Sequence, residues 1–471
     1  MILEESCLSR IPLFLYIGAL FYERTTTGTG HIAWIFNYNI CRIDTACTAD
    51  RNTKRAATPY IDALFTATTS VCVTGLIVET TMTHWSIFGQ AVIILLVQIG
   101  GLGVITITTG MFFMLRKRIT LGNRMLIQES MGLNTMTGLV PLVKKILIGT
   151  GIIEGIGAVL YATQYVPEFG IGYGVWAAIF NSISAFCNAG MDIVRDDSLR
   201  SYVTNPVMNF TTMGLIILGG LGFVVWKDLW QGFKKIVKDK VPVKRMIQQW
   251  RFQTKIVLSI TSFLILFGTI LIFLFEYHNP ATMESLSLPQ KIQASLFQSV
   301  TTRTAGFETV AQGALTDASS LVSMFLMIIG GSPTGTAGGV KTVTFAILVF
   351  CVLSVAKQEE SITLFKRRVP QNLLSKALAI IVINLIVLMT SVLLLLVFDH
   401  GTFMDSCYEC VSALATVGLT KGLTPNLTIA GKVIIIITMY LGRVGPISMA
   451  IGFSQKNKKK MVMYPEQDLI L

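Results

Sequence analysis

Long apolar runs alternate with short polar or charged stretches along most of the chain. The runs that predict membrane-spanning helices are Trp85–Leu115, Val140–Tyr165, Pro206–Trp226, Ile256–Phe275, Leu321–Val355, Leu378–Phe398 and Lys432–Phe453. A helix needs about 20 apolar residues to cross a bilayer, and these runs approach or exceed that length. The pattern predicts an all-α, polytopic membrane protein.

Shorter helical segments stand between the spanning runs. They are Ile61–Val71, Trp176–Phe186, Gln290–Thr302 and Met404–Leu414. Each is too short to span, so we expect each to enter the membrane as a half-helix and return.

A short segment that closes on glycine follows each half-helix. The segments are Val73-Thr74-Gly75, Asn188-Ala189-Gly190, Thr304-Ala305-Gly306 and Thr416-Val417-Gly418. Glycine accepts positive φ without strain, which helps a backbone to point its carbonyls one way. Rings of carbonyls replace the hydration shell of a permeating cation in channels. The segments therefore predict a four-part K⁺ selectivity filter.

These features recur at nearly even spacing. Successive filter glycines lie 115, 116 and 112 residues apart, and a second mark follows each filter glycine by 25, 29, 24 and 24 residues. The second marks are Gly100-Gly101, Gly219-Gly220, Gly330-Gly331 and Gly442-Arg443. Close helix packing alone explains the second mark but not the filter segments.

The repetition predicts four units of helix, re-entrant pore helix and helix around a pseudo-fourfold pore. Their predicted bounds are 1–138, 139–250, 251–370 with an interrupted second helix, and 371–471 with a short basic tail. The first helix of the first unit is not defined, because the apolar run Ile11–Tyr22 is short and polar residues follow it.

Composition and charge agree with a membrane protein and set its orientation. Of the 471 residues 52% are hydrophobic and only 14% charged, and the net charge is +12. Lys and Arg gather in the linkers between units and in the tail, which predicts that these face the cytoplasm and that nucleic acid is not a partner. Acidic residues flank the filters, and we expect them to face outside and attract cations.

A glycine-rich stretch, Gly330–Thr342, interrupts the apolar run of the third unit. Irregular backbone at membrane depth is tolerated where it is buried in protein or lines a cavity, so we interpret the stretch as a loop that obstructs the pore. A helix kink is the alternative. The residues predicted to form the gate are Gly335, Thr336, Ala337, Gly338, Gly339, Lys341 and Arg443.

Charged residues inside apolar segments need separate interpretations. Arg443 would repel K⁺, pin the gate loop through backbone carbonyls, or extend to an interface. Arg303 lies within the third filter stretch, and we expect it to point behind the filter. For Glu154 we favour a hydrogen bond to buried pore-helix or loop backbone over contact with an ion.

The chain resembles the K⁺-translocating membrane subunits of the Trk/Ktr/HKT superfamily, and most of all the KtrB type. The similar stretches are ALFTATTSVCVTGL (63–76), FNSISAFCNAGMD (180–192), SLFQSVTTRTAGF (295–307), SALATVGLT (412–420), GGSPTGTAGGVKT (330–342) and GRVGP (442–446). The resemblance implies a bacterial plasma-membrane homodimer with one pore in each protomer. It also implies a cytosolic, nucleotide-binding regulatory subunit of the RCK type (KtrA-like).

The expected function is gated K⁺ uptake, with K⁺ as the transported ion and no other metal. Relatives with Ser in the first filter tend to carry Na⁺, so Gly75 favours K⁺. Stimulation by Na⁺ is a further expectation. The alternatives are a Na⁺-permeable or poorly selective transporter of the same fold, and a non-transporting membrane assembly subunit. The sequence contains no nucleotide-binding loop, nucleophile motif or metal-binding motif, so we do not expect an enzyme.

Overall fold

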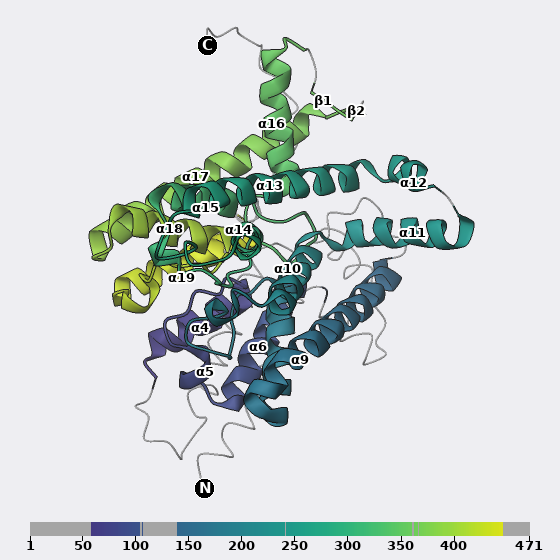
Figure 1. Cartoon of the computed structure of the whole chain (residues 1–471). Helices are drawn as coiled ribbons and strands as arrows, with labels where there is room; N and C mark the ends of the chain where they lie inside the picture. Colours follow the sequence, from purple (N-terminus) through teal and green to yellow (C-terminus); the bar gives the residue numbers. More distant parts are fainter. Residues whose placement is uncertain are drawn as a thin grey trace, which may run out of the picture.

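The computed structural model describes residues 58–103, 106, 139–240, 242–359, 362–365 and 367–445. The predictions for the run Ile11–Tyr22, for the end of the Trp85–Leu115 helix and for the basic tail lie outside these residues. Within the described part the fold is almost entirely helical, which confirms the all-α prediction (Figure 1). The described strands form one antiparallel hairpin, β1 (Thr363–Leu364) with β2 (Arg367–Arg368).

Short helices occupy the positions of all four predicted half-helices. They are α4 (Tyr60–Cys72), the second limb of α9 (Leu139–Cys187), α14 (Leu288–Thr301) and α18 (Phe403–Ala415). Helix α9 breaks at Gly170, which has φ 80° and ψ 168°. The break turns the chain back so sharply that a β-carbon at Gly174 would lie 2.8 Å from the Tyr165 carbonyl oxygen. The predicted span Val140–Tyr165 and the predicted half-helix Trp176–Phe186 of the second unit are therefore two limbs of α9, joined by a sharp bend at Gly170.

The remaining larger helices are the outer elements of the units. They are α6 (Ile87–Leu102), α10 (Pro206–Gly220), α11 (Phe223–Asp239), α13 (Phe252–Glu276), α15 (Asp317–Ile328), α16 (Thr342–Ala356), α17 (Gln371–Phe398) and α19 (Ile429–Val444). In the described part, α9, α13 and α17 are long and apolar enough to cross a membrane, and the bent pair α10–α11 passes the same test together. A non-helical loop separates α15 from α16, at the position where the sequence predicts an interruption of the third unit.

The predicted span Pro206–Trp226 is broken near its end by a bend that the sequence did not indicate. Helix α10 ends at Gly220 and α11 leaves it at 105°. Gly222 takes φ 86° at the bend. The basic linker after it is largely helical, in α11 and α12 (Val243–Gln249). The short elements are α5 (Thr81–His84) and the 3-10 turns η1 (Arg200–Tyr202), η2 (Gln312–Ala314) and η3 (Thr424–Asn426).

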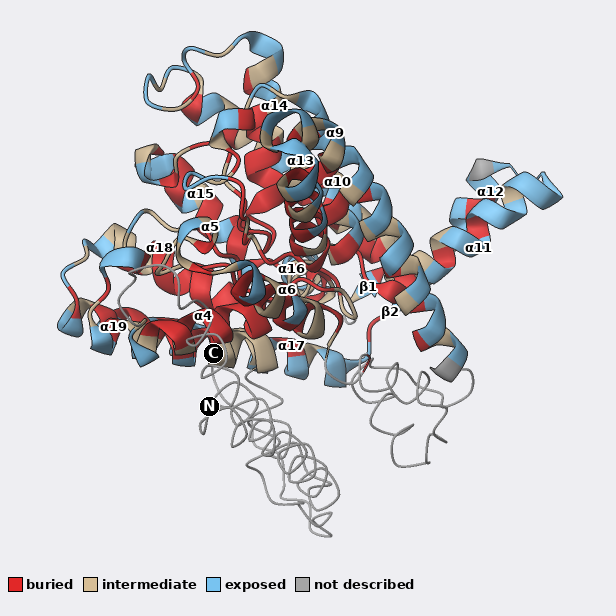
Figure 2. Ribbon diagram, turned by 90° about the horizontal axis from the view of Figure 1, so that it is seen from below, coloured by how far each residue is buried: buried red, intermediate tan, exposed pale blue. Residues whose placement is uncertain are grey.

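Many small polar side chains are buried in the interior beside apolar ones, and many large apolar side chains are exposed on the outside. Figure 2 shows where the chain is buried and where it is exposed. Ser182, Thr301 and Ser412 are fully buried, whereas Leu274 is 61% exposed and Val397 is 74% exposed. So many exposed large apolar side chains are unusual for a water-soluble protein. The distribution fits a molecule whose solvent is lipid and whose irregular backbone is enclosed by protein.

A buried ion pair connects the first unit with the fourth. Lys432 Nζ on α19 lies 2.5 Å from Asp62 Oδ1 on α4, and both side chains are largely buried. Asp62 lies in the first turn of its helix, where the helix dipole also stabilises a negative charge. Lys432 lies near a helix N-terminus, where that dipole opposes its charge.

We expect Asp62→Ala to lower the stability of the detergent-solubilised protein by about 3 kcal/mol, because Lys432 would be left buried and unpaired. Lys432→Ala should cost less, since α4 still stabilises Asp62. Thermal unfolding of both variants and of the double variant measures the coupling. Additive losses in the double variant would contradict the pairing.

Candidate functional site: a ring of four glycine segments

The four filter segments share an unusual backbone conformation. Their first residues and their glycines all have positive φ, whereas the residue between them does not. The values are 55° and 90° for Val73 and Gly75, 60° and 67° for Asn188 and Gly190, 66° and 81° for Thr304 and Gly306, and 53° and 95° for Thr416 and Gly418. In an ordinary extended strand successive carbonyls point to opposite sides. Alternating the sign of φ turns successive carbonyls toward the same side, as a cation-binding strand requires.

The segments lie against one another in a closed cycle. A β-carbon on any of the four glycines would collide with the carbonyl oxygen of the residue that precedes the glycine of the next unit. The pairs are Gly75 with Ala189, Gly190 with Ala305, Gly306 with Val417, and Gly418 with Thr74. The fourth unit thus contacts the first, and the ring closes in chain order.

Hydroxyl groups on the pore helices hold the segments in place. The backbone N–H of Gly75 donates to Thr69 Oγ1 at 3.0 Å, and that of Gly418 donates to Ser412 Oγ at 3.1 Å. In the other two units the hydroxyls of Ser184 and Thr301 donate to the carbonyl that follows the filter glycine. Sequence reasoning missed these residues. A Ser or Thr six residues before the glycine in units one, two and four is the signal that could have found three of them.

The second glycine marks place outer helices directly against the pore helices. A β-carbon at Gly100, Gly219 or Gly442 would collide with the carbonyl oxygen four residues before the filter glycine of its own unit. Those carbonyls belong to Val71, Phe186 and Leu414. In the third unit Gly330 instead meets the carbonyl of Gly338, which belongs to the predicted gate loop.

The loop between α15 and α16, Ile329–Lys341, is folded back on itself. The N–H of Gly330 donates to the Val340 carbonyl at 3.0 Å, and the N–H of Val340 donates to the Ile328 carbonyl at 3.0 Å. Its tip docks on the break between α10 and α11, where Ser332 N–H donates to the Gly220 carbonyl at 2.9 Å. The plain helix kink considered from the sequence is therefore excluded.

The same loop touches the pore-helix end of the ring. Thr336 Oγ1 donates to the Phe186 carbonyl at 3.2 Å and lies 3.5 Å from Asn188 Oδ1. A β-carbon at Gly338 would collide with Thr416 Oγ1. The loop therefore lies directly against the second and fourth filter segments.

Arg443 connects this loop to the first unit. Its Nη1 donates to the Thr336 carbonyl at 2.7 Å, and its Nη2 donates to the Gly100 carbonyl. Of the roles considered from the sequence, the geometry favours the pin through backbone carbonyls. Lys341 Nζ donates to the Ala337 carbonyl at 2.8 Å within the loop. Two partly buried cations thus hold the loop by its backbone oxygens.

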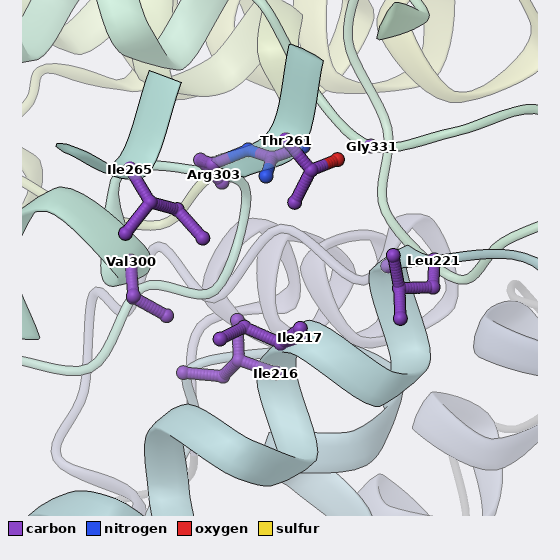
Figure 3. Close-up of a pocket in the computed structure, with 9 residues that line it drawn as sticks. Ile216, Ile217, Leu221, Thr261, Ile265, Val300, Arg303 and Gly331 are labelled. Atoms are coloured by element: carbon purple, nitrogen blue, oxygen red, sulfur yellow. The ribbon is translucent and has the colours of Figure 1, made fainter. Parts of the chain in front are cut away.

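Arg303, which is expected from the sequence to lie behind the filter, contacts residues of the second and third units. It is buried beside a cavity of about 10 Å³ that Ile216, Ile217, Thr261 and Val300 help to line (Figure 3). Its Nη2 lies 3.3 Å from the Gly330 carbonyl oxygen. This guanidinium therefore links the third filter segment to the beginning of the loop.

The expectation for Glu154 is wrong in its partner. Its carboxylate accepts hydrogen bonds from the side-chain amide of Gln98 at 3.1 and 3.3 Å, and within the described residues none comes from pore-helix or loop backbone. Its backbone carbonyl reaches the pore helix by accepting from Ser182 Oγ at 2.6 Å. The residue joins α6 to α9 through side chains.

Several acidic residues near the filters are structural parts of the outer loops rather than free charges. Glu276 is fully buried and accepts from Thr316, Asn279 and Thr282. Glu308 pairs with Arg200 at 2.6 Å. Asp192, in the loop after the second filter segment, has its pKa raised to about 6, because burial disfavours the carboxylate. That group takes up a proton as the pH falls below about 6.

Glu409 on α18 has no counterpart among the sequence predictions. It is fully buried and accepts from Thr420 Oγ1 at 2.7 Å and from Thr424 Oγ1. These bonds fix the backbone that leaves the fourth filter segment.

The described fold and its glycine ring are those of a membrane cation-transport protein. Residues 23–463 match the family described as TrkH, cation transport protein, and the chain belongs to that family of transporters. It is 39% identical over 409 residues to the Ktr system potassium uptake protein B of Vibrio alginolyticus, covering 87% of each chain. It is 37% identical to the protein of the same name from Bacillus subtilis, covering 87% of this chain and 89% of that one.

Two further proteins extend the comparison. The potassium/sodium uptake protein NtpJ of Enterococcus hirae is 36% identical, with 88% of this chain and 90% of that one covered. The crystal structure of the potassium transporter TrkH from Vibrio parahaemolyticus superposes with a TM-score of 0.67 at 16% identity. That superposition covers 94% of this chain and 84% of TrkH, and it shows a shared fold.

We expect Gly100→Ala to destabilise the protein by about 2 kcal/mol, because the added methyl group overlaps the Val71 carbonyl. Gly155→Ala is the matched control, since Gly155 is also helical but has no neighbour within 4 Å of its added β-carbon. The control should be neutral or stabilising by up to about 1 kcal/mol. Thermal unfolding in detergent compares the two, and equal midpoints would contradict the proposed close approach.

Proposed function

We propose that the chain is the K⁺-translocating subunit of a potassium uptake system in a bacterial plasma membrane, with the glycine ring as its selectivity filter. The observation that carries this proposal is the closed cycle in which each filter glycine lies against a carbonyl of the next unit. The names of the Vibrio alginolyticus and Bacillus subtilis relatives, both potassium uptake proteins, support K⁺ as the ion.

In this proposal the backbone of segments 73–75, 188–190, 304–306 and 416–418 coordinates the ion. Carbonyl oxygens there replace water around K⁺, so the ion crosses without a large dehydration penalty. The pore-helix hydroxyls fix the spacing of the oxygens, and the absence of β-carbons on the glycines lets the segments approach. Selectivity then depends on how little the ring can contract around the smaller Na⁺.

The loop Ile329–Lys341 acts as the gate in this proposal. It lies against the pore-helix end of the ring, and Arg443 holds it there through the Thr336 carbonyl. The charge of Arg443 also disfavours a cation in the same place. Opening requires the loop to leave the contacts it makes with Phe186 and Gly220.

The basic connections between units face the cytoplasm in this proposal, and the filter loops face outside. A cytosolic nucleotide-binding subunit of the RCK type docks on the inner face and moves the gate, and two copies of the chain form a dimer. The names of the relatives as the B component of a "Ktr system" support a partner of this kind.

A second candidate function is transport of Na⁺ together with, or in place of, K⁺. The Enterococcus hirae relative is named a potassium/sodium uptake protein, which favours including Na⁺ in the test. Stimulation of K⁺ uptake by Na⁺ is a finer form of the same idea.

Growth rescue and ion flux test the proposal. The chain, expressed with a regulatory subunit, should restore growth of an uptake-deficient bacterium at low K⁺. Purified protein in liposomes should carry Rb⁺ and K⁺ in preference to Na⁺. Failure of a correctly inserted protein to move any cation would support the assembly-subunit alternative.

We expect Gly306→Ser to reduce K⁺ over Na⁺ discrimination by about tenfold or more, because its β-carbon overlaps the Val417 carbonyl and distorts the ring. Competition of Na⁺ against Rb⁺ uptake measures the change. Gly422→Ser is the matched control, since Gly422 also has positive φ but faces open space. A filter assignment is untenable if both variants discriminate as the unaltered protein does.

We also expect removal of residues 335–339 to raise flux several-fold and to reduce its dependence on the regulatory subunit. Arg443→Gln should act in the same direction, because it weakens the pin on Thr336. Rb⁺ efflux from liposomes with and without the partner measures both. Lower flux from a well-folded deletion variant would show that the loop is not a barrier.

A further inference from the structure

Helix α11 has two different faces. Val225, Asp228 and Gly232, at helical spacing, are buried. Trp230, Phe233 and Val237 form the opposite, exposed stripe and are 61%, 57% and 64% exposed. Such spacing puts each set on one side of the helix. The exposed apolar stripe therefore has no protein cover in the described part of the chain.

The buried face fixes how α11 sits on the protein. Asp228 accepts from Thr254 Oγ1 of α13 at 2.6 Å and lies 3.3 Å from Arg251 Nε. A β-carbon at Gly232 would lie 2.8 Å from Met246 Sδ of α12. Because these contacts hold the opposite face of α11 against the protein, the stripe of Trp230, Phe233 and Val237 faces outward.

Lysines accompany the stripe. Lys234 Nζ lies 5.4 Å from the centroid of the Trp230 ring, and that ring stacks on Phe233 at 6.2 Å between centroids. Lys227 and Lys238 are also exposed on α11. Aromatic residues bordered by lysines on one helix face are typical of helices that lie in the membrane interface.

The helices at either end of the α11–α12 segment place that segment at the membrane surface. Helix α11 leaves α10 at 105°, and after α12 the chain enters the apolar span α13. Helices α11 and α12 project from the body together (Figure 2). With six charged residues, α11 is unsuited to the hydrocarbon core on its own: Lys227, Asp228, Lys234, Lys235, Lys238 and Asp239.

We propose that α11 lies in the interface of the cytoplasmic leaflet, with Trp230, Phe233 and Val237 inserted below the headgroups and its lysines bound to anionic lipid. The proposal rests on the orientation given under Proposed function. Lysine stems lie along apolar surface while their ammonium groups reach the headgroups. An anionic leaflet attracts each such lysine by about fivefold in partitioning.

Tryptophan quenching by brominated lipid tests this contact. The contribution of Trp230 is the difference in emission between the full chain and Trp230→Phe, both reconstituted in liposomes. With brominated phosphatidylglycerol we expect that contribution to fall by about twofold or more. The emission difference between the full chain and Trp250→Phe gives the contribution of Trp250, which is the matched control because the Trp250 ring lies against Gly232 on the buried face of α11. The Trp250 contribution should change little.

The charge component is tested by a triple variant, Lys227→Gln/Lys234→Gln/Lys238→Gln. It should lose most of the extra quenching by anionic over neutral brominated lipid, because the lysines supply the attraction to the anionic headgroups. Quenching that is equal in neutral and anionic lipid would overturn the headgroup assignment. Protection of the apolar span α17 from hydrogen exchange shows that the protein is inserted in the bilayer. If Trp230 of such an inserted protein is not quenched in either lipid, the exposed stripe of α11 binds a soluble protein instead of lipid and the proposal is wrong. Neither readout depends on ion transport, so its failure is separate from failure of the proposed function.

Discussion

Close approach between bare backbone segments is the constraint on which this structure depends. Four glycines face carbonyl oxygens of neighbouring units at separations that leave no room for a β-carbon. A buried backbone carbonyl without a hydrogen-bond donor costs free energy at membrane depth, unless the surrounding structure holds it in place or a cation binds to it. The pore helices, their hydroxyls and the closed order of the units all serve to hold those segments.

The outer helices follow from the same constraint. Gly100, Gly219 and Gly442 let α6, α10 and α19 touch the carbonyls at the ends of pore helices. Larger residues there would push the helices outward and widen the ring. Small and hydroxyl-bearing side chains consequently occupy the contacts around the pore helices, while many other bulky apolar residues are exposed on the lipid side.

The third unit departs from this rule, and the departure creates the candidate gate. Where the other units bring a helix glycine to the pore helix, the third brings its loop between Gly330 and Gly338. A loop has backbone donors and acceptors to satisfy, and it does so on the α10–α11 break and on Arg443. Its contacts therefore come from the second unit and the fourth, so a displacement of either would alter the loop.

Local sequence patterns were sufficient for the positions of the half-helices and for the loop that divides the long apolar run of the third unit, because these depend on segment length and glycine. Glu154, the bend between α10 and α11, and the buried role of Glu276 were beyond such patterns. Each depends on a partner far away in the chain. The order of the units around the ring was likewise decided only by the tertiary structure. The same holds for the two carbonyls that accept from Arg443, because every residue has a backbone carbonyl and the sequence does not show which of them a guanidinium will contact.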